Sequence, residues 1–337
     1  MAPPSQKTSS EQTVRRARTV LSGSEQERSW GNQQAQPADE AYESLAREVI
    51  QNGEILWPEY ERTGTGTLQK FGLSYVVDVS PHRFPVITTK KVFFSSVVAE
   101  LLWFLSGSSN ISELQEHTGI WNEWADDNGD LETAYGRYWR DYPQIGPGDL
   151  RMSEAKHETP HSHYRRHEKG VDQIAEVVQN IKDNPHSRRN VVVAWHPDNA
   201  WSSRLPPCHF AFVFHVTTAG KLCLEVHQRS GDIALGVPFN MASYALLLHI
   251  VADECGLKTG LMKHNITNAH VYLNHAEDLA HQLQRTSRGG PGIGLDFLGL
   301  PEETLMDMDL GNWGQYVDDY SLNNYNPHPP VKYEVAV

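Results

Sequence analysis

The sequence predicts an α+β fold. Strand-like and helix-like segments are interspersed along the chain without a repeating βαβ period, and the G-x-G-x-x-G fingerprint of a doubly wound dinucleotide-binding domain is absent. No internal repeat is visible. The 337 residues are enough to bury one large core, so the chain is long enough to form an enzyme.

The first segment, residues 1–40, predicts a disordered tail. It is rich in Ser, Gln, Pro and Glu and carries almost no apolar clusters, so burial cannot offset the entropy of ordering it. It has no apolar signal-peptide region, and no later segment approaches the roughly 18 consecutive apolar residues of a membrane span. We therefore expect neither secretion nor membrane insertion, and a cytoplasmic location, which would be the host cytoplasm if the protein is viral. The arginines at 15, 16 and 18 leave an organelle transit peptide as the alternative.

The following segments alternate between helical and extended patterns. Residues 41–52 carry apolar residues at helical spacing, and the turn R-T-G-T-G-T at 62–67 precedes strand-like residues. The run 96–105 predicts a buried helix, and 171–183 predicts an amphipathic helix that ends at an N-P break. The S-R-R pair at 187–189 then leads into a β-branched strand.

The second half predicts two strands and two helices. The strands are expected at 209–217 and 221–229. A long apolar helix follows P-F-N and runs to about residue 255, and a further helix covers roughly 274–286. The final residues V-K-Y-E-V-A-V alternate like a strand.

Charge and cysteine content exclude several classes of protein. The formal net charge is -13, which disfavours sequence-independent binding to nucleic acid phosphates. Three widely spaced cysteines without a C-x-x-C pair argue against a disulfide framework or a zinc ribbon, so a reducing compartment is the simpler expectation. A histidine group at 157, 161, 163 and 167 lies in the polar segment 151–170, where a functional metal site is not expected because no second shell is evident.

Two residues draw attention through their surroundings. Glu100 is the one charged residue of the predicted buried helix, so it must be paired, neutralised or used in proton transfer. Cys208 begins an apolar strand and is either a small core residue or a nucleophile. Its neighbour His209 points to the opposite face of a strand, so the two do not form a protease-like pair.

Four arginines are candidates for binding a phosphate. They sit beside turn or strand-edge residues, and with Ser230 in Q-R-S-G-D they could hold a phosphate monoester through charge-assisted bonds. They are Arg62, Arg188, Arg189 and Arg229. The glycine turn lacks the G-K-[ST] ending of a P-loop, so hydrolysis of a nucleoside triphosphate is not supported.

These motifs together resemble the thymidylate synthase family, which includes the phage pyrimidine nucleotide hydroxymethylases. The resemblance runs from about residue 41 to the C-terminus. It is carried, in order, by R-T-G-T-G-T, T-T-K-K, E-L-L-W-F-L, I-W-N-E-W-A-D-D-N-G-D, S-R-R, L-P-P-C-H, Q-R-S-G-D-I-A-L-G-V-P-F-N-M-A-S-Y, A-H-V-Y-L-N-H and Y-N-P-H-P.

The resemblance implies a fold and an assembly. The fold is a three-layer α+β domain over 41–337, with a bent six-stranded mixed sheet at the interface of a homodimer. Arg188 and Arg189 would reach across to the partner's active site, while Arg62, Arg229 and Ser230 hold the same nucleotide phosphate.

The resemblance also implies roles in catalysis. Cys208 would attack C6 of the pyrimidine ring as a thiolate, with Glu100 and Tyr135 in the proton-transfer network. His270 and Tyr272 would bind the sugar 3'-hydroxyl, and Asp232 would belong to the nucleotide site as well as to the folate site. The co-substrate would be methylenetetrahydrofolate, and no metal is implied. Its expected binding residues are Lys90, Trp121, Trp124, Asp232 and Val337.

The identity of the base follows from Asn240. An amide offers one donor and one acceptor, which fits the O4 and N3–H edge of uracil, whereas the relatives that use cytosine carry a carboxylate at this point. The expected substrate is therefore dUMP.

The product depends on three departures from the synthase pattern. Asn122 replaces an aspartate, E-T-A-Y-G at 132–136 replaces G-P-V-Y-G, and Asn268 replaces a second aspartate. A phage hydroxymethylase is altered at the corresponding places, and Glu132 could hold a water near the methylene carbon. We therefore expect a deoxyuridylate hydroxymethylase, which would imply a phage with modified DNA. The alternatives are an ordinary thymidylate synthase and, remotely, an inactive nucleotide-binding relative.

Overall fold

The computed structural model describes residues 4–21, 34–60, 63–80, 82–131, 134–143, 170–200, 203, 205–289, 292–297 and 308–335. Its α-helices are α1 (Pro4–Leu21), α2 (Ala38–Asn52), α3 (Phe94–Ser106), α4 (Tyr135–Arg140), α5 (Gln173–Asp183), α6 (Pro197–Ala200), α7 (Gly236–Glu254) and α8 (Ala276–Gln282). Its strands are β1 (Glu54–Leu56), β2 (Thr67–Asp78), β3 (Val191–Val193), β4 (His209–Val216), β5 (Lys221–Asp232), β6 (Lys258–Tyr272), β7 (Gly294–Phe297) and β8 (Tyr320–Asn323). Short 3-10 segments are η1 (Pro58–Tyr60), η2 (Leu114–Glu116) and η4 (Leu310–Asp319).

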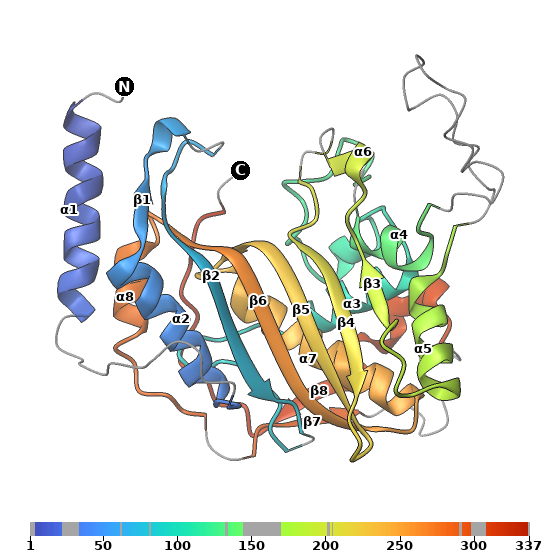
Figure 1. The fold of residues 1–337 in the computed structure, drawn as a ribbon. Helices are drawn as coiled ribbons and strands as arrows, with labels where there is room; N and C mark the ends of the chain where they lie inside the picture. Colours follow the sequence, from blue (N-terminus) through green and yellow to red (C-terminus); the bar gives the residue numbers. More distant parts are fainter. Residues whose placement is uncertain are drawn as a thin grey trace, which may run out of the picture.

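A six-stranded mixed sheet organises the molecule. Its order is β1-β2-β6-β5-β4-β3, and the pairing is antiparallel except between β5 and β6, which run parallel (Figure 1). Strands β7 and β8 form a separate antiparallel pair. Because β5 and β6 are parallel, their C-terminal ends lie side by side at the same end of the sheet.

Helix α7 forms the layer behind the sheet. It contacts β5 and β6 on one side and α3 on the other, and most of its residues are buried (Figure 1). A helix that is apolar on every side belongs in the interior of a protein, which explains why α7 lacks an amphipathic pattern. The apolar helix α3 is buried in the next layer and contacts α4 and η4. The α+β class and the layered, sheet-based fold expected from the sequence are therefore confirmed.

The other face of the sheet carries exposed side chains. No helix of the described residues crosses in front of β2, β6, β5 and β4 in Figure 1. Phe71 is 84% exposed, and Val191 and Leu261 are also exposed on their strands. Glu225 and Lys263 form an ion pair across β5 and β6 on partly exposed side chains, at 3.1 Å between Oε1 and Nζ. This face is therefore partly apolar.

Helix α1 lies within the segment 1–40 that the sequence suggested would be disordered. It packs beside α8 and α2, and Val14, Ala17 and Leu21 are buried there (Figure 1). The three positions lie on one face at helical spacing. This short apolar stripe is enough to stabilise the helix once it can be buried against α8 and α2. Residues 22–33 lie outside the described part of the chain.

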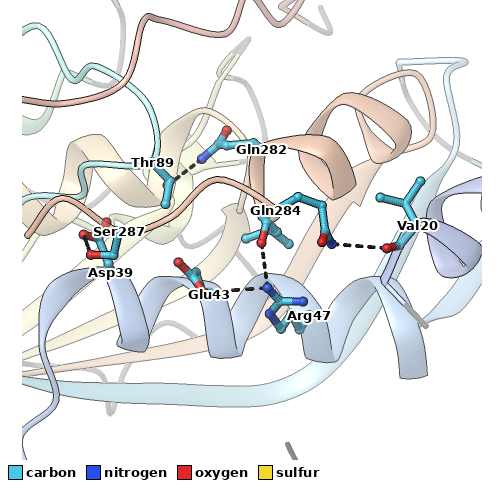
Figure 2. A network of polar contacts seen from close by, with 9 residues as sticks. Val20, Asp39, Glu43, Arg47, Thr89, Gln282, Gln284 and Ser287 are labelled. Carbon is cyan, nitrogen blue, oxygen red and sulfur yellow. Dashed lines mark hydrogen bonds and ion pairs between the residues drawn. The ribbon is translucent and has the colours of Figure 1, made fainter. Parts of the chain in front are cut away.

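Polar contacts link α1 to α2 and α8. Arg18 donates from Nε to the Ile50 carbonyl at 3.0 Å and from Nη2 to the Gly53 carbonyl at 3.1 Å, at the C-terminal end of α2. Gln284 donates to the Val20 carbonyl at 3.1 Å, and Arg47 of α2 donates to the Leu283 carbonyl at 2.6 Å (Figure 2). The N-terminal helix is thereby joined to α2 and to the end of α8.

The same network fixes the T-T-K-K segment. The buried Asp39 carboxylate accepts from the Thr88 backbone N–H and hydroxyl, both at 2.6 Å, and from the Ser287 hydroxyl at 2.5 Å. Gln282 of α8 donates to the Thr89 hydroxyl at 3.1 Å (Figure 2). These bonds position the backbone immediately before Lys90.

The docking of α1 leads to a stability prediction. Leu21→Ala is expected to lower the free energy of unfolding by about 2–4 kcal/mol, because Leu21 is fully buried and truncation leaves a cavity. Urea unfolding at one fixed protein concentration measures the change. Arg15→Ala, on the exposed side of the same helix, is the control and should leave stability nearly unchanged. Equal stability of both variants and the parent would show that α1 is not docked in solution.

Candidate active site

The backbone of Cys208 is held from two sides. Cys208 lies directly before β4 and is half-buried. Its N–H donates to the Tyr135 hydroxyl at 2.7 Å, and its carbonyl accepts from the Arg229 backbone N–H at 2.8 Å. Residues from α4 and β5 thus fix the position of the sulfur.

Arg229 reinforces this arrangement with its side chain. Its guanidinium donates to the carbonyls of Pro207 at 3.0 Å and Pro206 at 2.7 Å, and Nη2 lies 3.6 Å from the Cys208 sulfur. The guanidinium also lies over the Trp195 ring, 5.6 Å from its centroid. A positive charge beside a sulfur favours the thiolate, which is the nucleophilic form.

Glu100 is buried in the middle of α3 and accepts a hydrogen bond. Trp121 donates from Nε1 to its Oε1 at 2.8 Å. Burial raises the pKa of the Glu100 carboxyl to about 7, although the bond from Trp121 opposes this shift. A carboxyl group with this pKa can hold or release a proton near neutral pH, as general acid–base catalysis requires.

Tyr135 and His209 form a stacked pair behind Cys208. Their ring centroids lie 3.8 Å apart with an interplanar angle of 3°. The hydroxyl of Tyr244 lies 2.5 Å from His209 Nδ1, and burial lowers the pKa of His209 to about 3. Burial also raises the pKa of Tyr135 well above its ordinary value. Sequence reasoning gave His209 no role, and its place beside Cys208 in L-P-P-C-H was the available signal.

Four of the expected nucleotide-binding residues lie at the shared end of β5 and β6. Ser230 is opposite Asn268 and Asp232 is opposite His270 in the parallel register. The rings of His270 and Tyr272 lie 5.3 Å apart at 85°. In sheets with parallel strands, ligands often bind at the carboxyl ends of the strands, and these polar side chains meet there.

Asn240 lies one turn into α7, beside these strand ends. Its Oδ1 accepts from Gln228 Nε2 of β5 at 3.3 Å. The Q-R-S-G-D motif includes Gln228, but the sequence alone indicates no role for this residue. The structure therefore adds Gln228 to the group around the expected base-reading residue.

Asp232 and Lys90 lie close together on the side expected to bind folate. Asp232 Oδ1 accepts from the N–H groups of Ala234 at 2.8 Å and Leu235 at 3.3 Å, just before α7 begins. Lys90 donates to the Ala234 carbonyl at 2.5 Å and lies over the Tyr333 ring, 4.8 Å from its centroid. Burial lowers the pKa of Lys90 to about 8, while the charge of Asp232 opposes that change. Lys90 is thus buried rather than displayed at the surface.

Two other residues expected to bind folate are tryptophans. The rings of Trp121 and Trp124 are half-buried in the turn segment after η2. Among the described residues, no hydrogen bond engages Asp232 Oδ2, so this oxygen can accept an N–H from a pterin ring. The side chains present therefore fit a bound folate.

The two described departures from the synthase pattern both form hydrogen bonds with other side chains of the protein. Asn122 is exposed and accepts from Gln115 at 3.1 Å. Asn268 donates to Gln69 at 2.8 Å, and its Oδ1 lies 3.2 Å from His270 Nδ1. Asn268 can therefore orient His270, whereas Asn122 bonds to η2.

Several expected residues lie apart from this group or outside the described part. Arg188 and Arg189 are exposed in the turn before β3. The residues outside the described ranges are Arg62, Glu132, Val337 and the histidines of segment 151–170. Within the described residues, no cluster of three or more His, Cys, Asp or Glu side chains could hold a metal ion. None of the helices described here has the length and apolar character needed to cross a bilayer.

A comparison with protein families places the site in a known context. A sequence model of the family described as Thymidylate synthase matches residues 40–337. The match includes the Cys208, Glu100, Tyr135, Arg229 and Asn240 group and leaves α1 outside.

Proposed function

Because the chain belongs to the thymidylate synthase family over residues 40–337, we propose that it transfers a one-carbon unit to C5 of dUMP through a covalent adduct on Cys208. Enzymes of this family are one-carbon transferases that act on pyrimidine nucleotides. The observation that carries the proposal is the grouping of the Cys208 sulfur with Arg229, at 3.6 Å, and of the Cys208 backbone with Tyr135, at 2.7 Å.

The first step uses the sulfur and a proton donor. The Cys208 thiolate forms a bond to C6 of the pyrimidine, and the electrons of the C5=C6 bond move through C5 toward O4. Negative charge that develops at O4 needs a proton or a hydrogen-bond donor. Glu100, with a pKa of about 7, is the buried group able to supply that proton near neutral pH.

The nucleotide is held by its phosphate, sugar and base. We assign Arg62, Arg229 and Ser230 to the phosphate, His270 and Tyr272 to the sugar hydroxyl, and Asn240 to the base. Asn240 supports uracil because a carboxamide can donate to O4 and accept from N3–H.

Methylenetetrahydrofolate, when bound, supplies the one-carbon unit. The residues assigned to hold it are Lys90, Trp121, Trp124, Asp232 and Val337. Asp232 accepts from the pterin ring, and the tryptophan rings cover the apolar surface of the bound folate. No metal is assigned to the reaction.

A homodimer is part of the proposal. The open sheet face, with Phe71, Val191 and Leu261 exposed, supplies apolar surface for a second copy of the chain. Arg188 and Arg189 are exposed beside the edge strand β3, where they can extend to the neighbouring subunit's phosphate site.

We propose 5-hydroxymethyl-dUMP as the product, with water completing the reaction. This rests on Asn122, Glu132 and Asn268. Because Asn122 bonds to Gln115 and Asn268 to Gln69, Glu132 is the residue of the three assigned to hold the water. The alternative is dTMP with dihydrofolate, formed when tetrahydrofolate donates a hydride to the methylene carbon instead of water adding to it.

The product test uses purified protein, dUMP and methylenetetrahydrofolate. We expect a nucleotide heavier than dTMP by one oxygen by mass spectrometry, with no rise in dihydrofolate absorbance. Formation of dTMP together with dihydrofolate would overturn the hydroxymethylase and establish the synthase. Failure to form either product would overturn the transferase proposal itself.

The three departures are tested by reverting them. The variant Asn122→Asp/Glu132→Gly/Asn268→Asp is expected to shift the product toward dTMP, because the proposed water site is removed. Gln115→Ala, which only releases Asn122, is the matched control and should leave the product unchanged. An unchanged product in the triple variant would show that these positions do not determine the terminal step.

A further inference from the structure

We propose that Tyr75 and His264 are positioning residues that act through Gln228 to lock the Asn240 carboxamide in the orientation that selects uracil over cytosine. This inference rests on the proposed function, because it assumes that Asn240 reads the base. It assigns a role in specificity to two buried residues that do not contact the substrate.

The four side chains form one hydrogen-bonded chain across the sheet. Tyr75 of β2 is paired with His264 of β6, and its hydroxyl lies 2.8 Å from His264 Nδ1. His264 Nε2 lies 2.7 Å from Gln228 Oε1 of β5. Gln228 Nε2 then reaches Asn240 Oδ1 of α7 at 3.3 Å. Tyr75, His264 and Gln228 are all buried, so water does not compete for these bonds.

A backbone carbonyl fixes the direction of every bond in the chain. Gln228 Nε2 also donates to the Ser230 carbonyl at 2.8 Å, and a carbonyl can only accept. Gln228 must therefore direct Nε2 toward Ser230 and Oε1 toward His264. An oxygen at that position requires His264 Nε2 to carry the proton.

The protonation of His264 then determines the role of Tyr75. Burial lowers the pKa of His264 to about 3, so the ring is neutral and carries one proton. With that proton on Nε2, Nδ1 is an acceptor and the Tyr75 hydroxyl must be its donor. Among the described residues the Tyr75 hydroxyl has no other hydrogen-bond partner, so a ring protonated on Nδ1 would leave this buried O–H without an acceptor. Tyr75 therefore favours the histidine tautomer that matches Gln228.

The last hydrogen bond of this series fixes the orientation of the Asn240 carboxamide. Its Oδ1 faces the Gln228 N–H, so Nδ2 is left as a donor and the second lone pair of Oδ1 as an acceptor. Uracil offers an acceptor at O4 and a donor at N3–H, which this orientation matches. Cytosine offers a donor at N4 and an acceptor at N3, so Asn240 would have to flip. A flipped amide would place its NH₂ against the NH₂ of Gln228, which leaves both donors without an acceptor.

A purely structural role would not explain base selectivity. Two apolar side chains at these positions could fill the same interior without the cost of burying polar groups. A structural pair would affect stability alone, whereas a positioning pair also changes the preference between dUMP and dCMP. The ratio of the two dissociation constants separates these roles.

The experiment compares Tyr75→Phe with the control Tyr320→Phe in the full-length protein. Tyr320 is a buried tyrosine on β8, away from the chain. Dissociation constants for dUMP and dCMP are measured by titration calorimetry. We expect Tyr75→Phe to reduce the preference for dUMP about tenfold. Without the Tyr75 hydroxyl, the His264 proton is no longer held on Nε2, so His264 no longer always donates to the Gln228 oxygen. Tyr320→Phe should retain the parent ratio.

A spectroscopic readout tests the tautomer directly. The ¹⁵N shifts of the His264 imidazole are expected to report Nε2–H in the parent and a mixture of tautomers in Tyr75→Phe. The double variant Tyr75→Phe/His264→Phe removes both residues and leaves the Gln228 oxygen without its donor, so it should show at least the same loss of preference.

The outcomes distinguish the two proposals. If the parent protein shows no preference for dUMP over dCMP, the uracil assignment of the proposed function fails. If the parent prefers dUMP but both variants keep that preference, the proposed function stands and the positioning role of Tyr75 and His264 is overturned. Nδ1–H as the tautomer of the parent would also overturn it.

Discussion

Replacing Cys208 with alanine is expected to lower turnover of dUMP by about 10⁴-fold or more, because no other group can form the bond to C6. The binding of dUMP should change little, since the Cys208 sulfur contributes no hydrogen bond that the base requires. Turnover is followed by the release of tritium from C5 of labelled dUMP, and binding by calorimetry. Both measurements use the same preparation of protein.

The other two cysteines are matched controls. Burial raises the pKa of Cys255 to about 11, so its thiol stays protonated and unreactive. The Cys223 sulfur is half-buried on β5 and lies 3.3 Å from the Leu261 backbone nitrogen of β6, far along the strand from Arg229. Cys223→Ala and Cys255→Ala should therefore keep turnover within a few-fold of the parent. Turnover that survives in Cys208→Ala would refute covalent catalysis by this residue.

Glu100→Gln is expected to reduce turnover by about 10²–10⁴-fold, because glutamine cannot transfer a proton. The substitution keeps an oxygen for Trp121, which donates at 2.8 Å, so packing should survive. The pH profile of kcat/KM should show an inflection near 7 in the parent and lack it in the variant. An inflection that persists in Glu100→Gln would assign it to another group.

The same residue links stability to pH. Burial raises the pKa of Glu100 from its ordinary value of 4.5 to about 7, so between these values the folded protein binds a proton that the unfolded chain has released. The stability of the parent relative to Glu100→Gln therefore falls as pH rises through this window. The fall is about 3 kcal/mol and is complete above the folded pKa. Denaturant unfolding at pH 5 and pH 8 measures it, and a constant difference would contradict the shifted pKa.

Most helices and the β4–β5 hairpin could be predicted because their patterns are local. The apolar run before Leu105 and the amphipathic run after Asp172 form α3 and α5 within two residues of the expected bounds. The β-branched strand expected after S-R-R is present as β3, which ends at Val193. In these elements the spacing of apolar residues along the sequence matches the repeat of a helix or a strand, because the apolar side faces a neighbouring layer.

The central strand β6 escaped prediction because its interior is polar. His264 and His270 are buried, so the strand lacks a simple apolar alternation. Their partners, Tyr75 and Gln228, come from distant parts of the sequence. From sequence alone, a buried polar residue is predicted to be exposed, because its hydrogen-bond partner inside the protein is not known.

The two ends of the chain also differ from expectation. Helix α1 was missed because its apolar stripe is short and needs α8 as a partner. The strand predicted at the C-terminus is wrong for residues 331–335, which pair with no strand. Side-chain bonds hold this segment instead: the Tyr333 hydroxyl donates to Gln282 at 2.7 Å, and His275 Nε2 lies 2.7 Å from the Glu334 carbonyl.

The candidate site was predicted mainly through the resemblance to a family rather than through patterns. Cys208 and Glu100 stand out individually, but nothing local brings them together with Asn240. Their assembly depends on the tertiary arrangement of α3, β5 and α7. For the same reason, the roles of His209 and Gln228 became visible only when their neighbours were known.

The order of strands in the sheet sets a constraint on how the chain reaches its folded state. Strand β2 pairs along most of its length with β6. Leu68 therefore cannot pair with Val271 until β6 has been synthesised and has left the ribosome. Until then, the apolar residues of β2 present an unpaired edge, which promotes association between nascent chains. Pairing at so large a sequence separation also slows folding. Synthesis of this protein should therefore depend on chaperones more than that of a helical protein of equal length, and truncation before β6 should yield aggregates rather than a smaller domain.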